Sequence, residues 1–328
     1  MIGTCTPFRI SFVGGGSDMR SFYSRHPGAV VSTTINKYMY IFIHPFFDNR
    51  IQIKYSKTEL VDSIDRIEHP IVKAALKEFN ITGIDINSIA DIPAGTGLGS
   101  SCAFTVGLLY ALYSYISRFA SKELLANKAC EIEIDTLEEP IGKQDQYAVA
   151  FGGLNFITFH PNEEVTVEPV VMQAEKQKQL KQNLMMFYLG KHRSTREILK
   201  EQKENVENNK GNFDMLIRMT TLARELRKSL SEGNVDDMGL VLDENWQLKK
   251  RLSSKITTPE IDEYYKKAKE SGATGGKLLG AGGGGFMLFY CKKERQDGVR
   301  HALSGLREFP FTFENHGTHL FSYENQIE

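Results

Sequence analysis

The chain has almost no excess of charge of either sign. Its 328 residues include 40 Lys and Arg against 41 Asp and Glu, which gives a formal net charge of -1. Proteins that bind nucleic acid or anionic membranes electrostatically carry a marked basic excess, usually gathered in one patch. The balance therefore gives no support to a nucleic-acid or membrane partner, and any binding of phosphate has to be local.

Cysteines and long apolar runs are also scarce. The four cysteines lie far apart, without the CxxC or Cys/His spacing of a zinc site, and buried thiols in a reducing cytoplasm fit them best. No segment approaches the roughly 18 uninterrupted apolar residues of a membrane span. The N-terminus lacks the basic region and apolar run of a secretory signal. We therefore expect a cytoplasmic protein.

The length of the chain favours two domains. Short runs rich in β-branched and aromatic residues predict separate strands through the first 55 residues, and residues 195–231 predict a long polar helical region. Strands and helices do not alternate strictly, so the pattern predicts two α+β domains rather than a βαβ series. We place the boundary in the charged stretch of residues 162–182, with domains at residues 1–175 and 176–328.

A glycine-rich loop between a predicted strand and a predicted apolar helix indicates phosphate binding. Alternate glycines let main-chain N–H groups approach a ligand closely, and the N-terminus of a helix attracts anions. A glycine turn with a serine N-cap is the simpler alternative. No lysine precedes the serines, which excludes a Walker A loop, and the glycine spacing fits a dinucleotide fingerprint poorly. The residues concerned are Pro93, Gly95, Gly97, Leu98, Gly99, Ser100 and Ser101.

This loop, PAGTGLGSS, resembles the signature loop of the GHMP kinases, named after galactokinase, homoserine kinase, mevalonate kinase and phosphomevalonate kinase. TPFRI through GGGSD resembles the N-terminal substrate motif of that family, and KLLGAGGGGFMLF resembles its C-terminal glycine-rich motif. The resemblance spans nearly the whole chain. It implies a two-domain GHMP kinase fold, with a ribosomal-protein-S5-like N-terminal domain and a ferredoxin-like C-terminal domain. It also implies a kinase that uses ATP and Mg²⁺.

The resemblance implies catalytic roles for Asp145, as the base or orienting group at the acceptor hydroxyl, and for Arg9 beside it. Taken alone, an Asp in a Gly-bounded loop is more often a turn residue, and Arg9 could be a charge on an edge strand. The resemblance further implies that Glu133 and Ser101 hold Mg²⁺. Helical spacing supports Glu133, because it shares a face with small residues that include Ala129, although a surface acid remains the alternative.

For the sugar, the resemblance implies binding by the two glycine-rich motifs. PFRISFVGGGSD, GKQDQYAVAFGG and ENWQLKKRLS are most similar to the bacterial D-glycero-D-manno-heptose 7-phosphate kinases, which phosphorylate the anomeric C1 hydroxyl. A fucokinase-like or galactokinase-like enzyme, or a non-catalytic sensor on the same fold, is the alternative. Either a monomer or a homodimer is compatible with the sequence. The residues of the two motifs are Gly15, Gly16, Asp18, Gly282 and Gly283.

A phosphorylated sugar needs cationic partners. Two basic clusters are candidates, although each could equally be solvated surface charge. We take the first as our hypothesis, with Lys191 and Arg193 as the binding residues. The clusters consist of Lys191, His192, Arg193 and Arg196, and of Lys249, Lys250 and Arg251.

Overall fold

A computed structural model describes residues 1–190 and 195–323. In these residues the larger sheet has nine strands, ordered β13-β1-β2-β5-β3-β4, with β6 and β12 also paired to β2 and with β7 paired to β6. All its pairings are antiparallel except that of β3 with β5. The strands are β1 (Ile2–Val13), β2 (Gly28–Pro45), β3 (Ile51–Lys54), β4 (Thr58–Val61), β5 (Ile84–Ala90), β6 (Leu154–Phe159), β7 (Val165–Pro169), β12 (Phe313–Glu314) and β13 (His319–Tyr323).

The prediction of separate strands was wrong for β2, which runs unbroken through two of the predicted segments. A register shift opposite Pro7 and Phe8 lets the strand pass Asn36 and Lys37 without ending. The backbone N–H of Asn36 donates to the carbonyl of Thr312 instead, so this polar break in the sequence is satisfied by a distant segment.

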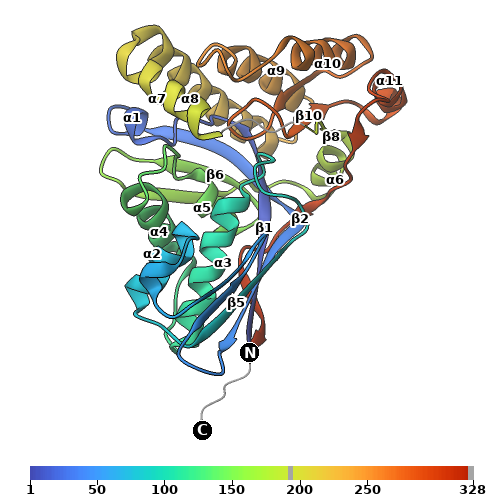
Figure 1. Ribbon diagram of the computed structural model, residues 1–328. Helices are drawn as coiled ribbons and strands as arrows, with labels where there is room; N and C mark the ends of the chain where they lie inside the picture. The colour runs from blue at the N-terminus through green and yellow to red at the C-terminus, as the bar shows by residue number, and fades with distance from the viewer. Residues whose placement is uncertain (191–194, 324–328) are drawn as a thin grey trace.

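Helices cover one face of the larger sheet (Figure 1). Helix α3 packs against β1 and β2 and is buried on nearly all sides, as its apolar sequence predicts. Helix α4 begins after Ser121, whose hydroxyl accepts from the Leu124 N–H, and continues into a π-helical segment, η2. The helical elements of the N-terminal half are α1 (Arg20–Tyr23), which contacts α7 of the other half, η1 (Ile64–Arg66), α2 (Pro70–Phe79), α3 (Ser100–Tyr115), α4 (Lys122–Cys130), η2 (Glu131–Thr136) and α5 (Gln144–Phe151).

The smaller sheet, ordered β11-β8-β10-β9, is antiparallel and packs against helices of the C-terminal half. Its core includes Phe187, Phe289 and the single tryptophan, Trp246. The long helical region of residues 195–231 is divided at Asn209, whose side chain accepts from the Gly211 N–H and so caps α8. The remaining elements are α6 (Ala174–Asn183), β8 (Leu184–Tyr188), α7 (Thr195–Asn208), α8 (Lys210–Ser231), α9 (Asp237–Lys249), α10 (Pro259–Glu270), β9 (Gly275–Leu278), β10 (Phe286–Tyr290), η3 (Lys293–Arg295), α11 (Gln296–Ala302) and β11 (Arg307–Glu308).

The chain returns to its starting sheet at its C-terminal end. Strand β13 pairs with β1, and β12 pairs with β2, so both lie in the larger sheet (Figure 1). The position between residues 175 and 176, where we placed the domain boundary, lies inside α6. The N-terminal half is thus closed by strands that follow the whole C-terminal half in sequence.

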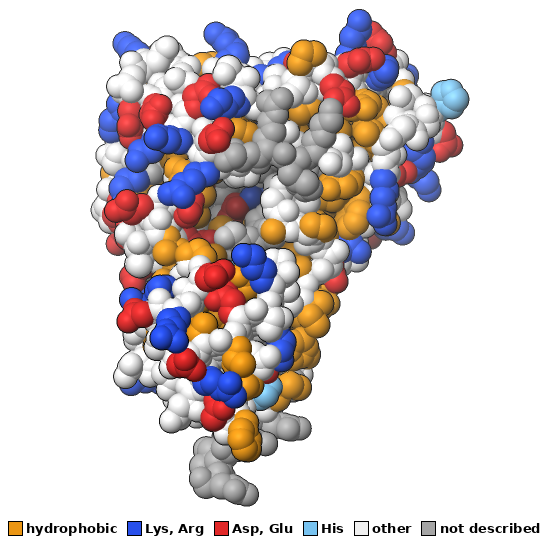
Figure 2. Space-filling view, viewed as in Figure 1, with side chains coloured by type: hydrophobic (Ala, Val, Ile, Leu, Met, Phe, Trp, Pro, Cys, Tyr) orange, Lys and Arg blue, Asp and Glu red, His pale blue; other side chains and the backbone are white. Residues whose placement is uncertain are grey.

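Charged side chains of both signs are interspersed over the surface shown in Figure 2, as the balanced composition leads us to expect. Among the described residues, no helix combines the length and the apolarity needed to cross a membrane.

Candidate active site

Residues of both halves of the chain meet around one cavity of about 350 Å³. Most of the predicted site residues line it, namely Arg9, Gly15, Gly16, Asp18, Gly95, Gly97, Gly99, Ser100, Ser101, Glu133, Asp145 and Gly282. Pro93, Leu98 and Gly283 are not among its lining residues. Lys191, His192 and Arg193 lie outside the described residues, whereas Arg196 lines the cavity.

The predicted phosphate loop leads directly into α3. Gly95, Gly97 and Gly99 all have positive φ values, of 77°, 85° and 77°. Such angles strain residues other than glycine. Gly99 is the N-cap residue of α3 and has no side chain that could cap the helix. The first N–H groups of the helix therefore have no side-chain partner at the cap, and Ser100 and Ser101 beside them line the cavity. The loop has the local geometry that anion binding requires.

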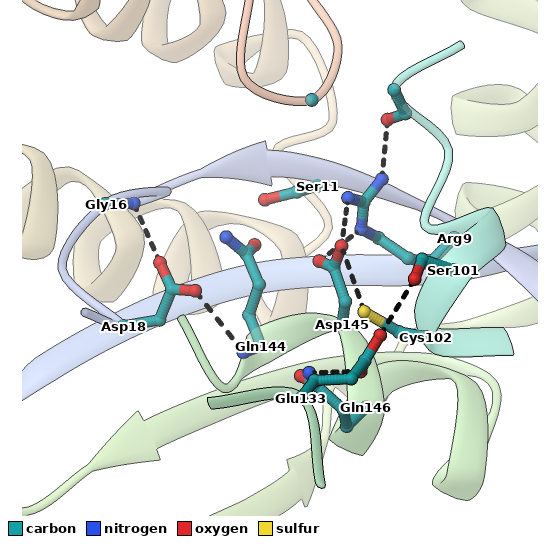
Figure 3. Close-up of polar contacts among 12 residues, drawn as sticks. Arg9, Ser11, Gly16, Asp18, Ser101, Cys102, Glu133, Gln144, Asp145 and Gln146 are labelled. Carbon is teal, nitrogen blue, oxygen red and sulfur yellow. Dashed lines mark hydrogen bonds and ion pairs between the residues drawn. The ribbon is translucent and has the colours of Figure 1, made fainter. Parts of the chain in front are cut away.

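The Arg9 guanidinium and the Asp145 carboxylate form a bidentate ion pair at the centre of the site (Figure 3). Arg9 Nε donates to Asp145 Oδ1 over 2.6 Å, and Nη2 donates to Oδ2 over 2.5 Å. The third nitrogen, Nη1, donates to the Gly97 carbonyl over 2.7 Å, which ties the pair to the phosphate loop. Burial acts to lower the pKa of Arg9, but the carboxylate outweighs it and raises that pKa. Arg9 therefore stays charged and fixes the Asp145 carboxylate.

Asp145 lies in the first turn of α5, and the interpretation of its segment as a Gly-bounded loop was wrong. The segment is helical because Tyr147, Val149 and Ala150 bury their side chains. This places the carboxylate at a helix N-terminus, where the backbone stabilises negative charge. Cys102 Sγ, 4.0 Å from Asp145 Oδ2, is the neighbouring thiol.

Glu133 is buried, with 1% of its surface exposed, although it belongs to a charged segment. Ser101 Oγ donates to Oε1 over 2.9 Å, and Gln146 Nε2 donates to Oε2 over 2.8 Å (Figure 3). Burial raises the pKa of Glu133, and these hydrogen bonds oppose part of that rise. The backbone here is π-helical rather than the α-helix that our spacing argument assumed, but Glu133 still faces inward beside Ala129 and Cys130.

Asp18 lies across the cavity from the Arg9–Asp145 pair. Its Oδ1 accepts from the Gly16 N–H over 2.8 Å and its Oδ2 from the Gln144 N–H over 3.3 Å (Figure 3). Burial, followed by the charge of Asp145, raises the pKa of Asp18. A Cβ at Gly142 would lie 2.0 Å from Asp18 Oδ2, so only glycine fits there. The Asp18 carboxylate is thus held by two main-chain segments.

The two glycine-rich loops pack backbone against backbone. A Cβ added to Gly97 would lie 2.6 Å from the Leu279 carbonyl oxygen, and one added to Gly280 would lie 2.4 Å from the Gly97 Cα. A side chain at either position would force the loops apart. The C-terminal glycine motif therefore forms the wall facing the phosphate loop.

Sequence reasoning missed that two lysines in this wall are buried. Lys277 in β9 was not singled out, and Lys249 at the end of α9 was named only within the second cluster of candidate cations for a substrate phosphate, yet both line the cavity. A signal was present for Lys249, because Leu242 and Trp246 recur on its side of the helix at helical spacing and are buried. For Lys277 the signal was a lysine within a short strand whose other residues are apolar or glycine.

Within the described ranges, no three His, Cys, Asp or Glu side chains are grouped to hold a metal ion. Ser101 and Glu133 nevertheless supply adjacent hard oxygen donors beside the phosphate loop. Mg²⁺ that binds together with phosphate oxygens and water takes only one or two protein ligands of this kind. The donor set fits Mg²⁺.

Two family models match the chain. Residues 51–153 match "GHMP kinases N terminal domain" and residues 226–306 match "GHMP kinases C terminal". Among curated proteins, the chain is 27% identical to the D-glycero-alpha-D-manno-heptose 7-phosphate kinase of Campylobacter jejuni, over 95% of this chain and 97% of that protein. It is 26% identical to the galactokinase of Pyrococcus furiosus, over 93% of this chain and 92% of that protein.

A solved structure is also similar over nearly its whole length. The crystal structure of a D-glycero-D-manno-heptose 1-phosphate kinase from Bacteroides thetaiotaomicron has a TM-score of 0.81 and 25% sequence identity, and covers 99% of this chain and 100% of that one. The names of the two heptose enzymes differ in the position of the phosphate, so these relatives agree on a heptose phosphate and not on which one.

Proposed function

The chain belongs to the GHMP kinase family, and from that premise we propose that it transfers a phosphoryl group from ATP to the C1 hydroxyl of D-glycero-D-manno-heptose 7-phosphate, forming the 1,7-bisphosphate. Family membership, the two-domain mixed helix and strand fold, and a sugar kinase activity were predicted and are confirmed by the matches. The sugar, the anomeric position and the residue roles are our proposals.

The observation that supports this proposal most strongly is the Arg9–Asp145 ion pair facing a glycine loop at the start of a buried helix. Phosphoryl transfer requires mainly positioning and charge neutralisation, with a carboxylate at the acceptor hydroxyl. Asp145 would orient the hydroxyl and accept its proton as the oxygen bonds to the γ-phosphorus. The bond from that phosphorus to the bridging oxygen then breaks, and ADP leaves with the electron pair. Arg9 would stabilise the charge on the transferred group.

Ser101 and Glu133 would hold Mg²⁺, which when bound neutralises phosphate charge. The main-chain N–H groups of the loop and the first turn of α3 would bind the phosphates of ATP. Asp18 would accept hydrogen bonds from sugar hydroxyls, with Gly15, Gly16 and Gly282 allowing the sugar to approach the backbone. Arg196 lies on the cavity wall with Lys191 and Arg193 close in sequence, and these cations would bind the phosphate at C7.

The Campylobacter relative supports heptose 7-phosphate as the substrate, and the galactokinase relative keeps an unphosphorylated hexose as the second candidate. The proposed cytoplasmic location is compatible with four free cysteines that are all buried. We leave monomer and homodimer as equal proposals.

The test is an ATP-consumption screen with Mg²⁺ over free hexoses, hexose phosphates and heptose 1- and 7-phosphates, followed by location of the new phosphate by phosphorus NMR. Turnover of heptose 7-phosphate to the 1,7-bisphosphate supports the proposal. Turnover of free galactose or fucose alone would transfer the assignment to the second candidate. Tight ATP binding without turnover of any sugar would favour a sensor.

A further inference from the structure

Two lysines in the cavity wall are buried and have no carboxylate partner in the part of the chain that the structure describes. Lys249 is 5% exposed and Lys277 is 2% exposed. Lys249 Nζ donates to the Gly280 carbonyl, and Lys277 Nζ donates to the Ser11 carbonyl over 2.7 Å. Within residues 1–190 and 195–323 neither makes an ion pair or a second hydrogen bond. Because an ammonium group has three N–H donors, each lysine has donors left for which the described residues supply no acceptor.

Burying a charged ammonium group is unfavourable unless an anion or further hydrogen bonds compensate for the lost solvation. Burial, reinforced by the charge of Arg9, lowers the pKa of Lys249 to about 8. Burial followed by the charge of Lys249 lowers the pKa of Lys277 well below its ordinary value. The charges of Asp18 and Asp145 oppose the shift of Lys249, and the charge of Asp18 opposes that of Lys277, but burial outweighs them in both cases. An anion bound beside the two lysines would favour their charged forms and accept hydrogen bonds from them.

The Ser11 hydroxyl adds an independent observation at the same place. Ser11 is 6% exposed and lines the cavity, but its Oγ has no hydrogen-bond partner in the described part of the chain. Its carbonyl is the acceptor for Lys277, so the hydroxyl and that ammonium belong to one small region. Figure 3 shows the Ser11 side chain directed into the space between Asp18 and the Arg9–Asp145 pair. A buried hydroxyl that makes no hydrogen bond costs free energy unless a bound ligand supplies the partner.

We propose that Lys249, Lys277 and the Ser11 hydroxyl form a subsite that binds a phosphoryl group of one of the two substrates, an inference that rests on the proposed kinase function. A phosphate group can accept hydrogen bonds from both ammonium groups and from the hydroxyl at once. Two sources can supply it: the phosphoryl group being transferred from ATP, or the phosphate that the sugar already carries.

The experiment uses the full chain and removes the charge of each lysine while nearly keeping the length of its side chain. Lys249→Met and Lys277→Met are compared with Lys249→Arg and Lys277→Arg. The matched control is Lys250→Met, because Lys250 follows Lys249 in sequence but pairs with Asp262 and is not a cavity-lining residue. Binding of ADP, which lacks the transferred group, is measured for every variant and verifies that each is folded.

We expect each Met variant to lower kcat/KM for the sugar phosphate by at least about tenfold, with partial recovery in the Arg variant. If the subsite holds the transferred group, kcat falls with phosphorylated and unphosphorylated sugars alike. If it holds the phosphate of the sugar, KM rises for the sugar phosphate alone. Binding of inorganic phosphate, measured by calorimetry, weakens by a similar factor in both cases.

The subsite is overturned if both Met variants keep kcat, KM and phosphate affinity within twofold of the wild type, or if Lys250→Met has an equal effect. The phosphate titration does not depend on turnover. Wild-type protein that binds phosphate through these lysines but phosphorylates no sugar would refute the proposed function and retain the subsite.

Discussion

The cavity has an N-terminal wall, which contains Arg9, Glu133 and Asp145, and a C-terminal wall, which contains Lys249 and Lys277. The charged side chains of the two walls are balanced in different ways. On the N-terminal wall, Asp145 is paired with Arg9, and Glu133 accepts hydrogen bonds from Ser101 and Gln146. On the C-terminal wall, Lys249 and Lys277 donate only to backbone carbonyls among the described residues. The carboxylates of Asp145 and Glu133 are thus partnered before any ligand arrives, whereas the two lysines keep N–H donors for an anion. Groups that must keep one geometry are held by the protein, and groups that must bind a substrate keep free donors.

Breaking the N-terminal wall at its centre gives the largest expected effect. Asp145→Asn keeps the size of the side chain and can still accept one hydrogen bond from Arg9, but it removes the carboxylate at the acceptor hydroxyl. We expect kcat to fall about 10³-fold while the affinity for ATP changes little, as for loss of a general base. Steady-state kinetics with the best substrate of the screen, together with nucleotide titration, test this. A near-normal kcat would remove Asp145 from the chemistry.

Arg9→Lys tests whether the positive charge beside Asp145 is sufficient or whether the planar guanidinium geometry is also required. Lysine keeps the positive charge but cannot donate to both Asp145 oxygens and to the Gly97 carbonyl at once. We expect a fall of about 100-fold in kcat, smaller than for Asp145→Asn because the carboxylate remains. Lys37→Arg, outside the cavity lining, serves as the control. Equal losses in Arg9→Lys and Arg9→Met would mean that the fork geometry is essential; wild-type kcat in Arg9→Lys would show that charge alone suffices.

The two walls also differ in how much of their structure could be predicted from the sequence. The phosphate loop, the buried helix α3 and the inward position of Glu133 follow from local signals: alternate glycines, an apolar sequence and helical spacing with Ala129. The phosphate loop could therefore be predicted before the fold was known.

The C-terminal wall depends on contacts between distant segments, and the local signals around Lys249 and Lys277 indicate burial without indicating the segment that each lysine contacts. Lys277 is buried because β9 lies where its ammonium can reach Ser11 of β1, 266 residues earlier in the chain. The return of β13 to β1 likewise depends on a pairing across most of the chain. Asp145 was placed in a loop because the buried partners of α5 could not be seen in a segment of eight residues.

The pH dependence of Mg²⁺ activation sharpens the comparison on the N-terminal wall. Burial raises the pKa of Glu133, so its carboxyl is protonated below that raised value and loses the proton as the pH rises through it. Because Mg²⁺ requires the ionised form, we expect the half-saturating Mg²⁺ concentration to rise up to about tenfold per pH unit below the raised pKa. Measurements of rate against Mg²⁺ from about pH 5 to pH 8 test this.

Glu133→Gln provides the reference, because protonation of ATP affects both proteins equally. The difference between the two pH profiles of the half-saturating Mg²⁺ concentration therefore gives the contribution of the Glu133 carboxyl. Parallel profiles would show that Glu133 does not bind the ion.

The smallest expected effect concerns the contact between the phosphate loop and the C-terminal glycine-rich loop. Gly97→Ala introduces a Cβ 2.6 Å from the Leu279 carbonyl oxygen at a φ of 85°. Gly190→Ala is the matched control, because Gly190 has a φ of 69° and no atom of the described residues lies within 4 Å of a Cβ added there. Both variants carry the cost of a left-handed backbone, about 1 kcal/mol, and only Gly97→Ala adds the clash. We expect Gly97→Ala to lower the free energy of unfolding by about 1–3 kcal/mol more than the control in urea denaturation. Equal losses would mean that the loops move apart freely, and the alignment of the C-terminal lysines with Arg9 and Asp145 would then have to come from the bound substrates.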